Sequence, residues 1–175
     1  IEKGTFAECT SLENLQLSDN TTGIEEIAFN NCRSLTSVYL PNSVKTIGSA
    51  AFYNCSSLST VRMSEGIESV GENAFWGTEF LKSGMADEYG SVYLGKVLLY
   101  NRGLNSTVIV KDSTKVIANA VFINNSGLRE IELPEGIIEI GDNCFENCEA
   151  LKKIDIKEGL KKIGENSFAG AGVEE

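Results

Sequence analysis

Apolar residues recur along this chain with a period of about 23 residues, and each period contains a short alternating segment. Residues 29–52 show one period clearly. Val38 and Leu40 are two positions apart, so they point to one face of a strand while Tyr39 points to the other. Pro41 follows and ends the strand, because it has no N–H to donate to a neighbouring strand. One period therefore predicts one rung of a solenoid.

Stacking such rungs turns every apolar position into a column, because a single rung cannot bury its apolar side alone. The first column is Phe6, Phe29, Phe52, Phe75, Phe122, Phe145 and Phe168. The second is Leu12, Leu35, Leu58, Leu81, Leu128 and Leu151. The third is Leu15, Val38, Val61, Val108, Ile131 and Ile154. We interpret all three columns as core, with parallel strands on one side of each rung and tighter turns on the other.

The period is interrupted once, over residues 76–107. Gly84 stands where a valine or isoleucine is expected. Within the interruption, residues 91–100 predict a hairpin, with two strands around a Gly-Lys turn. We expect the stack to continue through this segment, which gives one domain over residues 1–175 with about seven rungs. The chain begins and stops inside a repeat, so we expect a fragment of a longer protein.

The consensus F-x-x-C-x-x-L-x-x-V-x-L-P-x-x-V-x-x-I-G-x-x-A closely resembles the BspA-like class of leucine-rich repeats over nearly the whole chain. The resemblance implies a right-handed β/α solenoid with short strands and helical turns on the side opposite the parallel strands. It also implies a secreted or cell-surface bacterial protein, since several members are adhesins for host matrix proteins or other cells. The repeated residues form the scaffold, so the resemblance transfers no functional residue.

Composition excludes several classes of function. The formal net charge is -10 and histidine is absent. An acidic chain lacks the electrostatic footprint for nucleic acid or anionic lipid, and no apolar run is long enough to span a bilayer. Without histidine, the usual serine and cysteine triads cannot form. We therefore predict a protein that is not an enzyme and has no cofactor.

Four of the five cysteines share one slot, three residues after a rung phenylalanine, with Thr78 and Asn125 in the same slot of other copies. A slot shared by Cys, Thr and Asn suggests a small side chain that donates a hydrogen bond into a turn. We predict buried free thiols, because parallel stacked side chains seldom offer the dihedral of a disulfide. A zinc site is not expected, since there is no short paired Cys spacing.

One carboxylate pair lies at equivalent positions of adjacent rungs, Glu132 and Asp155. Their separation of roughly 5 Å is compatible with retaining glycoside hydrolysis. With 25 acidic residues, however, neighbouring carboxylates on a solvated face are expected, and Lys152 and Lys153 can neutralise them. We favour the solvated face.

The residues predicted to bind a ligand lie on the outward side of the strands and in the interruption: Tyr39, Arg62, Trp76, Tyr89, Tyr93, Glu132 and Asp155. Aromatic residues and arginine are enriched in binding hot spots, and a loop-rich break in a rigid scaffold often carries function. We expect Tyr39 and Arg62 to border a groove walled by residues 84–105. The alternative is that the aromatics of the interruption fill the core of an irregular rung.

These observations favour a protein-binding or adhesion module on the cell surface or outside the cell. Its partner, by family resemblance, is a host matrix or cell-surface protein, and we expect a monomer. The first alternative is a structural spacer without a ligand. A carbohydrate-binding or glycoside-acting surface is the less favoured alternative.

Overall fold

The computed structural model describes residues 1–63, 66–83 and 86–173. The chain forms two compact units, unit 1 (Ile1–Met85) and unit 2 (Ala86–Glu175), and each is described by itself. Gly84, which marks the break in the repeat, lies outside the described residues. The prediction that both units belong to one continuous stack stays a prediction.

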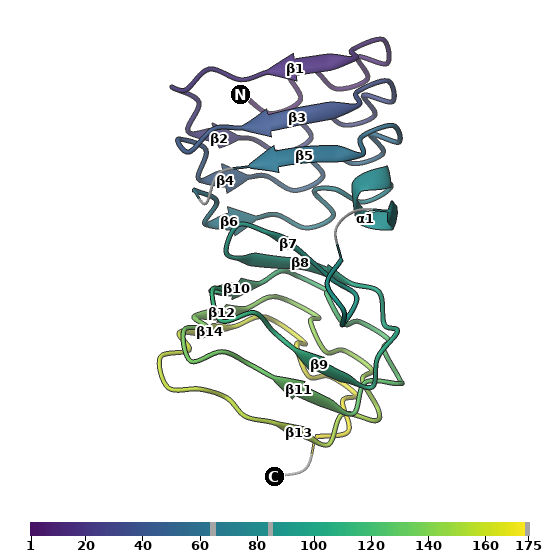
Figure 1. The fold of residues 1–175 in the computed structure, drawn as a ribbon, viewed down its shortest axis with the longest axis vertical. Helices are drawn as coiled ribbons and strands as arrows, with labels where there is room; N and C mark the ends of the chain where they lie inside the picture. The colour runs from purple at the N-terminus through teal and green to yellow at the C-terminus, as the bar shows by residue number, and fades with distance from the viewer. Residues whose placement is uncertain (64–65, 84–85, 174–175) are drawn as a thin grey trace. The chain divides into compact units, whose positions relative to one another are not determined.

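Unit 1 consists of stacked rungs with one parallel sheet on each side (Figure 1). The first sheet contains β1 (Asn14–Gln16), β3 (Ser37–Leu40) and β5 (Thr60–Met63). The second contains β2 (Gly23–Ile24), β4 (Thr46–Ile47) and β6 (Ser69–Val70). Neighbouring strands pair with an offset of one repeat, since Val38 lies opposite both Leu15 and Val61. The 23-residue period of the sequence is therefore the register of the sheets.

The phenylalanine column forms a continuous ring stack in unit 1. The ring centroids of Phe6, Phe29, Phe52 and Phe75 are 5.2, 5.2 and 5.1 Å apart in succession, and the interplanar angles are 6°, 6° and 11°. Phe29 and Phe52 have no exposed surface. The spacing matches the separation of hydrogen-bonded strands, so the rings repeat at the distance that the backbone imposes. The predicted core is confirmed at Phe29, Phe52 and Phe75, whereas Phe6 in the first rung is half-buried.

The turns around each phenylalanine use two residues with positive φ. Asn31 and Asn54 have φ of 60° and 56°, and Ile27 and Ala50 have φ of 52° each. Asparagine tolerates the left-handed region better than other residues with a side chain, because its amide can hydrogen-bond locally. The far side of the regular rungs is therefore built from these tight turns and two-residue strands. The helical turns predicted there are not observed in the described regular rungs.

A helix occurs where the repeat breaks: α1 spans Glu79–Ser83. Phe80 in α1 is 2% exposed, packs edge-on against Phe75 at 5.7 Å, and its N–H donates to the carbonyl of Leu58. Leu81, predicted for the leucine column, is only half-buried. That prediction is wrong, because the helix directs the residue before Leu81 into the core.

Unit 2 repeats the two-sheet arrangement. One sheet contains β9 (Thr107–Ile109), β11 (Glu130–Glu132) and β13 (Lys153–Ile154). The other has the order β14-β12-β10-β8-β7, with β10 (Val116–Ile117), β12 (Glu139–Ile140) and β14 (Lys162–Ile163) in parallel. Phe122, Phe145 and Phe168 stack with centroids 5.2 Å apart at each step. The members of the three columns are buried up to Leu151, which confirms the predicted core there, whereas Ile154 and Phe168 of the last rung are half-buried.

The predicted hairpin begins unit 2. β7 (Ser91–Leu94) and β8 (Val97–Asn101) pair antiparallel around Gly95, which has a φ of 57°. β8 then pairs in parallel with β10, with Val97 opposite Val116, an offset of 19 residues. The hairpin therefore supplies two strands of the sheet, and β8 is the one that continues the parallel register at an offset shorter than a full repeat.

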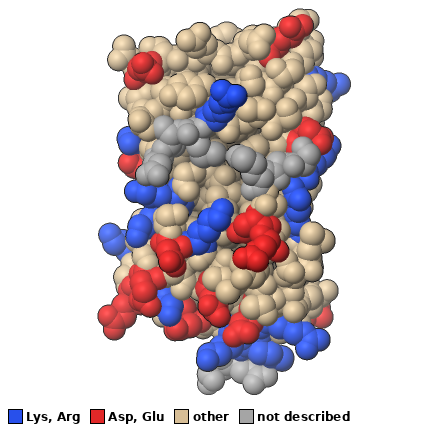
Figure 2. Space-filling view, viewed as in Figure 1, with Lys and Arg blue, Asp and Glu red and all other residues tan. Residues whose placement is uncertain are grey.

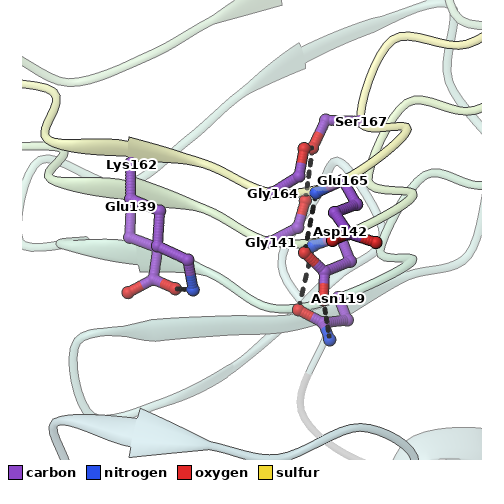
Figure 3. Close-up of polar contacts among 8 residues, drawn as sticks. All are labelled: Asn119, Glu139, Gly141, Asp142, Lys162, Gly164, Glu165 and Ser167. Carbon is purple, nitrogen blue, oxygen red and sulfur yellow. Dashed lines mark hydrogen bonds and ion pairs between the residues drawn. The ribbon is translucent and has the colours of Figure 1, made fainter.

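A polar ladder links successive rungs of unit 2 near the bend that recurs in each of them (Figure 3). Asn119 Oδ1 accepts the N–H of Asp142 at 3.0 Å, and Asp142 Oδ1 accepts the N–H of Glu165 at 2.8 Å. On the same sheet, Lys162 Nζ lies 2.7 Å from Glu139 Oε1. The two Oδ1 contacts satisfy backbone N–H groups at positions where the chain turns between strands. The carboxylate of Asp142 therefore has a structural role.

Candidate functional site

The outward positions of β1, β3 and β5 form one surface, which we call the strand face of unit 1. It consists of Asn14, Gln16, Ser37, Tyr39, Thr60 and Arg62. The intervening residues Val38 and Val61 are 1% and 4% exposed, so the alternation predicted from the sequence is confirmed. Figure 2 shows few charged side chains over these strands. Of the six residues, only Arg62 carries a charge.

Tyr39 and Arg62 lie opposite each other on β3 and β5, in register. Tyr39 is 50% exposed, and Arg62 is exposed as well. Residues opposite each other on neighbouring strands have their Cβ atoms about 5 Å apart, so one ligand can contact both side chains. Among the residues that the structure describes, Arg62 has no carboxylate partner. This pair is the candidate site of unit 1.

Trp76 does not belong to the strand face. It follows Phe75 directly, in the position that Asn30 and Tyr53 occupy in the preceding rungs, and it lies outside the β1-β3-β5 sheet. Its side chain is 51% exposed. The prediction from the sequence grouped Trp76 with Tyr39 and Arg62 because of residue type. In the structure, Trp76 lies in a turn of its rung.

Tyr89 and Tyr93, the two tyrosines of the interruption that were predicted to bind a ligand, are both half-buried. The ring of Tyr93 faces Lys111, whose Nζ lies 4.2 Å from the ring centroid, and its hydroxyl accepts the Lys111 N–H at 3.3 Å. Burial raises the pKa of Tyr93. The N–H of Tyr89 donates to Asp87 Oδ1 at 3.0 Å. Tyr93 therefore packs within unit 2, as the alternative interpretation of the interruption expects.

The carboxylates of Glu132 and Asp155 face solvent on the β9-β11-β13 side of unit 2, beside a shallow depression lined by residues of β11, by Leu133, and by Lys153, Asp155 and Lys157. Lys157 Nζ lies 2.6 Å from Asp155 Oδ2 and 3.4 Å from Glu135 Oε1. The hydrogen bond from Lys157 lowers the pKa of Asp155, and the charges of Lys157 and Lys153 lower it further. A retaining glycosidase needs one carboxyl group that stays protonated. The lowered pKa of Asp155 makes it unsuited to be that acid, although an ionised carboxylate would suit the nucleophile.

The sequence missed Lys157 as the partner of Asp155 and proposed Lys152 and Lys153 instead. Lys157 is two residues from Asp155, and a long side chain that reaches back across a turn leaves no signal in the repeat register. The repeat spacing would have been sufficient to predict that Glu130 and Lys153 are neighbours, because they are one repeat apart. They lie opposite each other on β11 and β13.

The cysteine slot has the hydrogen-bonding role predicted for it. The thiols of Cys32, Cys55 and Cys148 donate to the carbonyls of Phe6, Phe29 and Phe122, each in the preceding rung, at 3.1, 3.1 and 3.0 Å. Burial raises the pKa of Cys55 to about 12 and that of Cys148 to about 11. All five cysteines are free thiols in the structure, and only Cys9 is exposed. The thiols therefore connect rungs, and the buried ones remain protonated near neutral pH.

The stacked rungs and their consensus define a leucine-rich-repeat solenoid. A family model described as the BspA type leucine rich repeat region matches in six copies, over residues 1–88 and 92–173. The chain therefore belongs to the BspA-type leucine-rich-repeat family. The six copies replace the seven rungs expected from the sequence.

Solved structures with a similar fold come from several bacteria. A leucine-rich repeat protein from Bacteroides ovatus is 20% identical, with 96% of this chain and 55% of that chain covered and a TM-score of 0.48. A leucine rich cell surface protein from Faecalibacterium prausnitzii is 22% identical, with 96% and 60% covered and a TM-score of 0.44. For the leucine rich repeat protein of T. pallidum, the identity is 25%, the coverage 85% and 69%, and the TM-score 0.47.

The chain spans little more than half the length of the Bacteroides ovatus protein. No curated protein matches the chain. Among the described residues, no helix is long and apolar enough to cross a membrane.

Proposed function

We propose that this chain is a non-catalytic protein-binding module of a secreted or cell-surface bacterial protein, and that it binds its partner through the strand face of unit 1. The observation that carries the proposal is the exposed Tyr39–Arg62 pair on adjacent strands. Its partner class, a matrix or cell-surface protein of a host, follows from the resemblance of the repeat consensus and from membership of the family.

The two strands that carry the pair form a rigid support. β3 and β5 pair over four residues, and the residues beneath Tyr39 and Arg62 are buried, so both backbones are fixed before a partner arrives. Fixed anchors lose little conformational entropy on binding. Tyrosine offers a large apolar ring with a polar end, and arginine offers a planar charged group, which together suit the centre of a protein interface. The uncharged Ser, Thr, Asn and Gln side chains around them can form its polar rim.

The test is direct binding to immobilised fibronectin, fibrinogen, laminin and collagen by biolayer interferometry, with the chain as the analyte. Replacement of both Tyr39 and Arg62 by alanine should weaken binding at least about tenfold, or 1.4 kcal/mol, since hot-spot truncations commonly cost that much. The melting temperature should stay within about 2 °C of the parent value, because exposed side chains contribute little to stability.

The matched control replaces Tyr53 and Lys45, an aromatic and a cation of unit 1 that lie outside the β1-β3-β5 sheet. This control should bind like the parent. Equal loss in both variants would show that the strand face is not the site. If the parent binds none of these proteins, or any wider set of extracellular proteins, the spacer interpretation replaces binding.

A further inference from the structure

Four asparagines of this chain precede a serine or threonine by two positions, in the pattern Asn-X-Ser/Thr: Asn20, Asn54, Asn105 and Asn124. Enzymes that attach N-linked glycans modify the asparagine of this pattern where it lies in a surface loop. An acceptor in a folded chain needs an exposed side chain and a side-chain amide that is not held by another residue. It also needs a backbone that can move into the enzyme without breaking the contacts between rungs.

Asn20 has all three properties. It lies in the turn between β1 and β2 (Figure 1), and its side chain is exposed. Its side-chain amide forms no hydrogen bond with any residue in the described part of the chain. Its backbone N–H donates to Ser18 Oγ at 3.2 Å, and the N–H of Thr21 donates to the Ser18 carbonyl at 2.8 Å. Both bonds are local to the turn, so moving Asn20 does not unpair one rung from the next.

Asn54 and Asn105 are less accessible. Asn54 is half-buried, its N–H donates to the carbonyl of Trp76 in the following rung at 2.8 Å, and the next residue, Cys55, has no exposed surface. Asn105 is half-buried as well, and its Nδ2, the atom that would receive a sugar, donates to the carbonyl of Glu88 at 3.2 Å. Modification of either asparagine therefore requires local unfolding.

Asn124 is exposed, but the following rung holds it in place. Its Oδ1 accepts a hydrogen bond from Asn147 Nδ2 at 2.9 Å, and its N–H donates to the carbonyl of Glu146 at 2.8 Å. Its φ is 58°, in the left-handed turn of a regular rung. Of the four asparagines, Asn20 alone is exposed, has its amide available and lies in a turn with only local bonds.

We propose that Asn20 is a modification site, the acceptor of an N-linked glycan transferred from a sugar diphosphate. A bond forms between Asn20 Nδ2 and C1 of the sugar, and the bond from C1 to the diphosphate oxygen breaks. The amide nitrogen gives one proton to a base of the transferase, and the diphosphate leaves with the lipid or nucleotide that carried the sugar. Thr22, which is exposed, supplies the hydroxyl of the pattern. The site uses no residue of the strand face of unit 1, so it is independent of the proposed protein-binding function.

The experiment incubates the folded chain with two kinds of transferase and measures the attached mass by intact mass spectrometry. One arm contains an oligosaccharyltransferase and a polyprenyl-diphosphate-linked oligosaccharide, and the other contains a soluble N-glycosyltransferase and UDP-glucose. These arms distinguish a lipid-linked donor from a nucleotide-linked donor. We expect a single glycan in at least one arm, located at Asn20 by peptide mapping. Thr22→Ala should lower its occupancy at least about tenfold, whereas Thr22→Ser should keep it, because the pattern requires a hydroxyl at this position.

The matched control is Ser56→Ala/Thr107→Ala/Ser126→Ala, which removes the hydroxyls of the other three patterns and should be modified like the parent. Thr22→Ala should melt within about 2 °C of the parent, since the side chain is exposed, so that unfolding does not explain a lost glycan.

Three results would overturn the proposal. The folded chain could stay unmodified in both arms, even if the urea-denatured chain is modified. The glycan could be attached to another asparagine while Asn20 remains free. Finally, Thr22→Ala could be modified as fully as the parent, which would show that the pattern at Asn20 is not recognised.

Discussion

Replacement of Phe52 by alanine tests how much the ring stack stabilises unit 1. Phe52 has no exposed surface, and its ring stacks on Phe29 at 5.2 Å and on Phe75 at 5.1 Å. Truncation of a buried phenylalanine costs about 3–5 kcal/mol because it leaves a cavity. Each stacked ring pair adds roughly 0.5–1.5 kcal/mol beyond area burial, so the loss of two pairs places Phe52→Ala near the upper end of that range.

The assay is urea unfolding followed by the fluorescence of Trp76, the only tryptophan of the chain, which follows Phe75 directly. At a slope of about 1–2 kcal/mol per molar urea, a loss of about 4 kcal/mol lowers the midpoint by roughly 2–4 M. If unit 1 of the alanine variant is already unfolded in buffer, Phe52→Leu supplies a milder change of about 1–2 kcal/mol, because leucine keeps the position apolar but ends the stack.

Phe6→Ala is the matched control. Phe6 occupies the same column, but it is half-buried and has one stacking neighbour, Phe29. Its replacement should cost about 1–2 kcal/mol, since less apolar area and one ring pair are lost. The reasoning is refuted if Phe52→Ala costs no more than Phe6→Ala, or if it costs less than about 1 kcal/mol.

Four further predictions address the turns, the accessibility of the thiols, the pKa of one thiol, and the hairpin. Ala50→Asn should raise the free energy of unfolding of unit 1 by about 0.5–1 kcal/mol in urea titrations, because φ is 52° at Ala50 and asparagine tolerates the left-handed region better; a loss of stability would contradict the turn model. In the folded chain at pH 8, 5,5′-dithiobis(2-nitrobenzoate) should modify Cys9 alone. After denaturation without reductant it should modify all five thiols. A count of about one thiol in the denatured chain would reveal disulfides. Burial raises the pKa of Cys55 from 9.0 to about 12, so the stability that the buried neutral thiol contributes is present below pH 9 and is lost as the pH rises towards 12. In alkaline unfolding experiments, the free energy of unfolding of Cys55→Ala should therefore fall less steeply with pH than that of the parent. An equal slope in the two proteins would argue against burial. Asn101→Ala should destabilise unit 2 by about 1–3 kcal/mol in calorimetry, because the Asn101 amide donates to the Tyr89 carbonyl and to Ser91 Oγ in a buried setting; a change under about 0.3 kcal/mol would exclude this role.

The rungs could be predicted from the sequence because identical residue types recur at one offset, and that offset is the register of the parallel strands. Val38 opposite Val61 and Phe29 stacked on Phe52 both follow from it. The repeat offset no longer predicts which residue is buried where a segment changes its local conformation. Phe80 enters the core in place of Leu81 because α1 interrupts the repeat there, and no periodic signal marks the start of a five-residue helix.

The part of the candidate site that depends on the repeat could also be predicted from the sequence. Tyr39 and Arg62 are neighbours because they are one repeat apart, and the structure confirms their register. Trp76 and Tyr93 were grouped with them by residue type, which does not determine where a side chain lies. The contact between Lys157 and Asp155 depends on a flexible side chain that reaches across a turn, and repeat spacing carries no information about such a contact.

Hydroxyl-radical footprinting of the chain, with and without a matrix protein that it binds in the interferometry assay, tests the proposed site most directly. Tyr39 and Trp76 belong to the same unit and are 50% and 51% exposed, so the free chain offers two aromatic side chains with nearly equal access. The proposal predicts that the partner suppresses oxidation of Tyr39 several-fold and leaves Trp76 unchanged, because a bound partner covers only the surface that it contacts. Unchanged oxidation of Tyr39 in the complex, or protection of Trp76 alone, would contradict it.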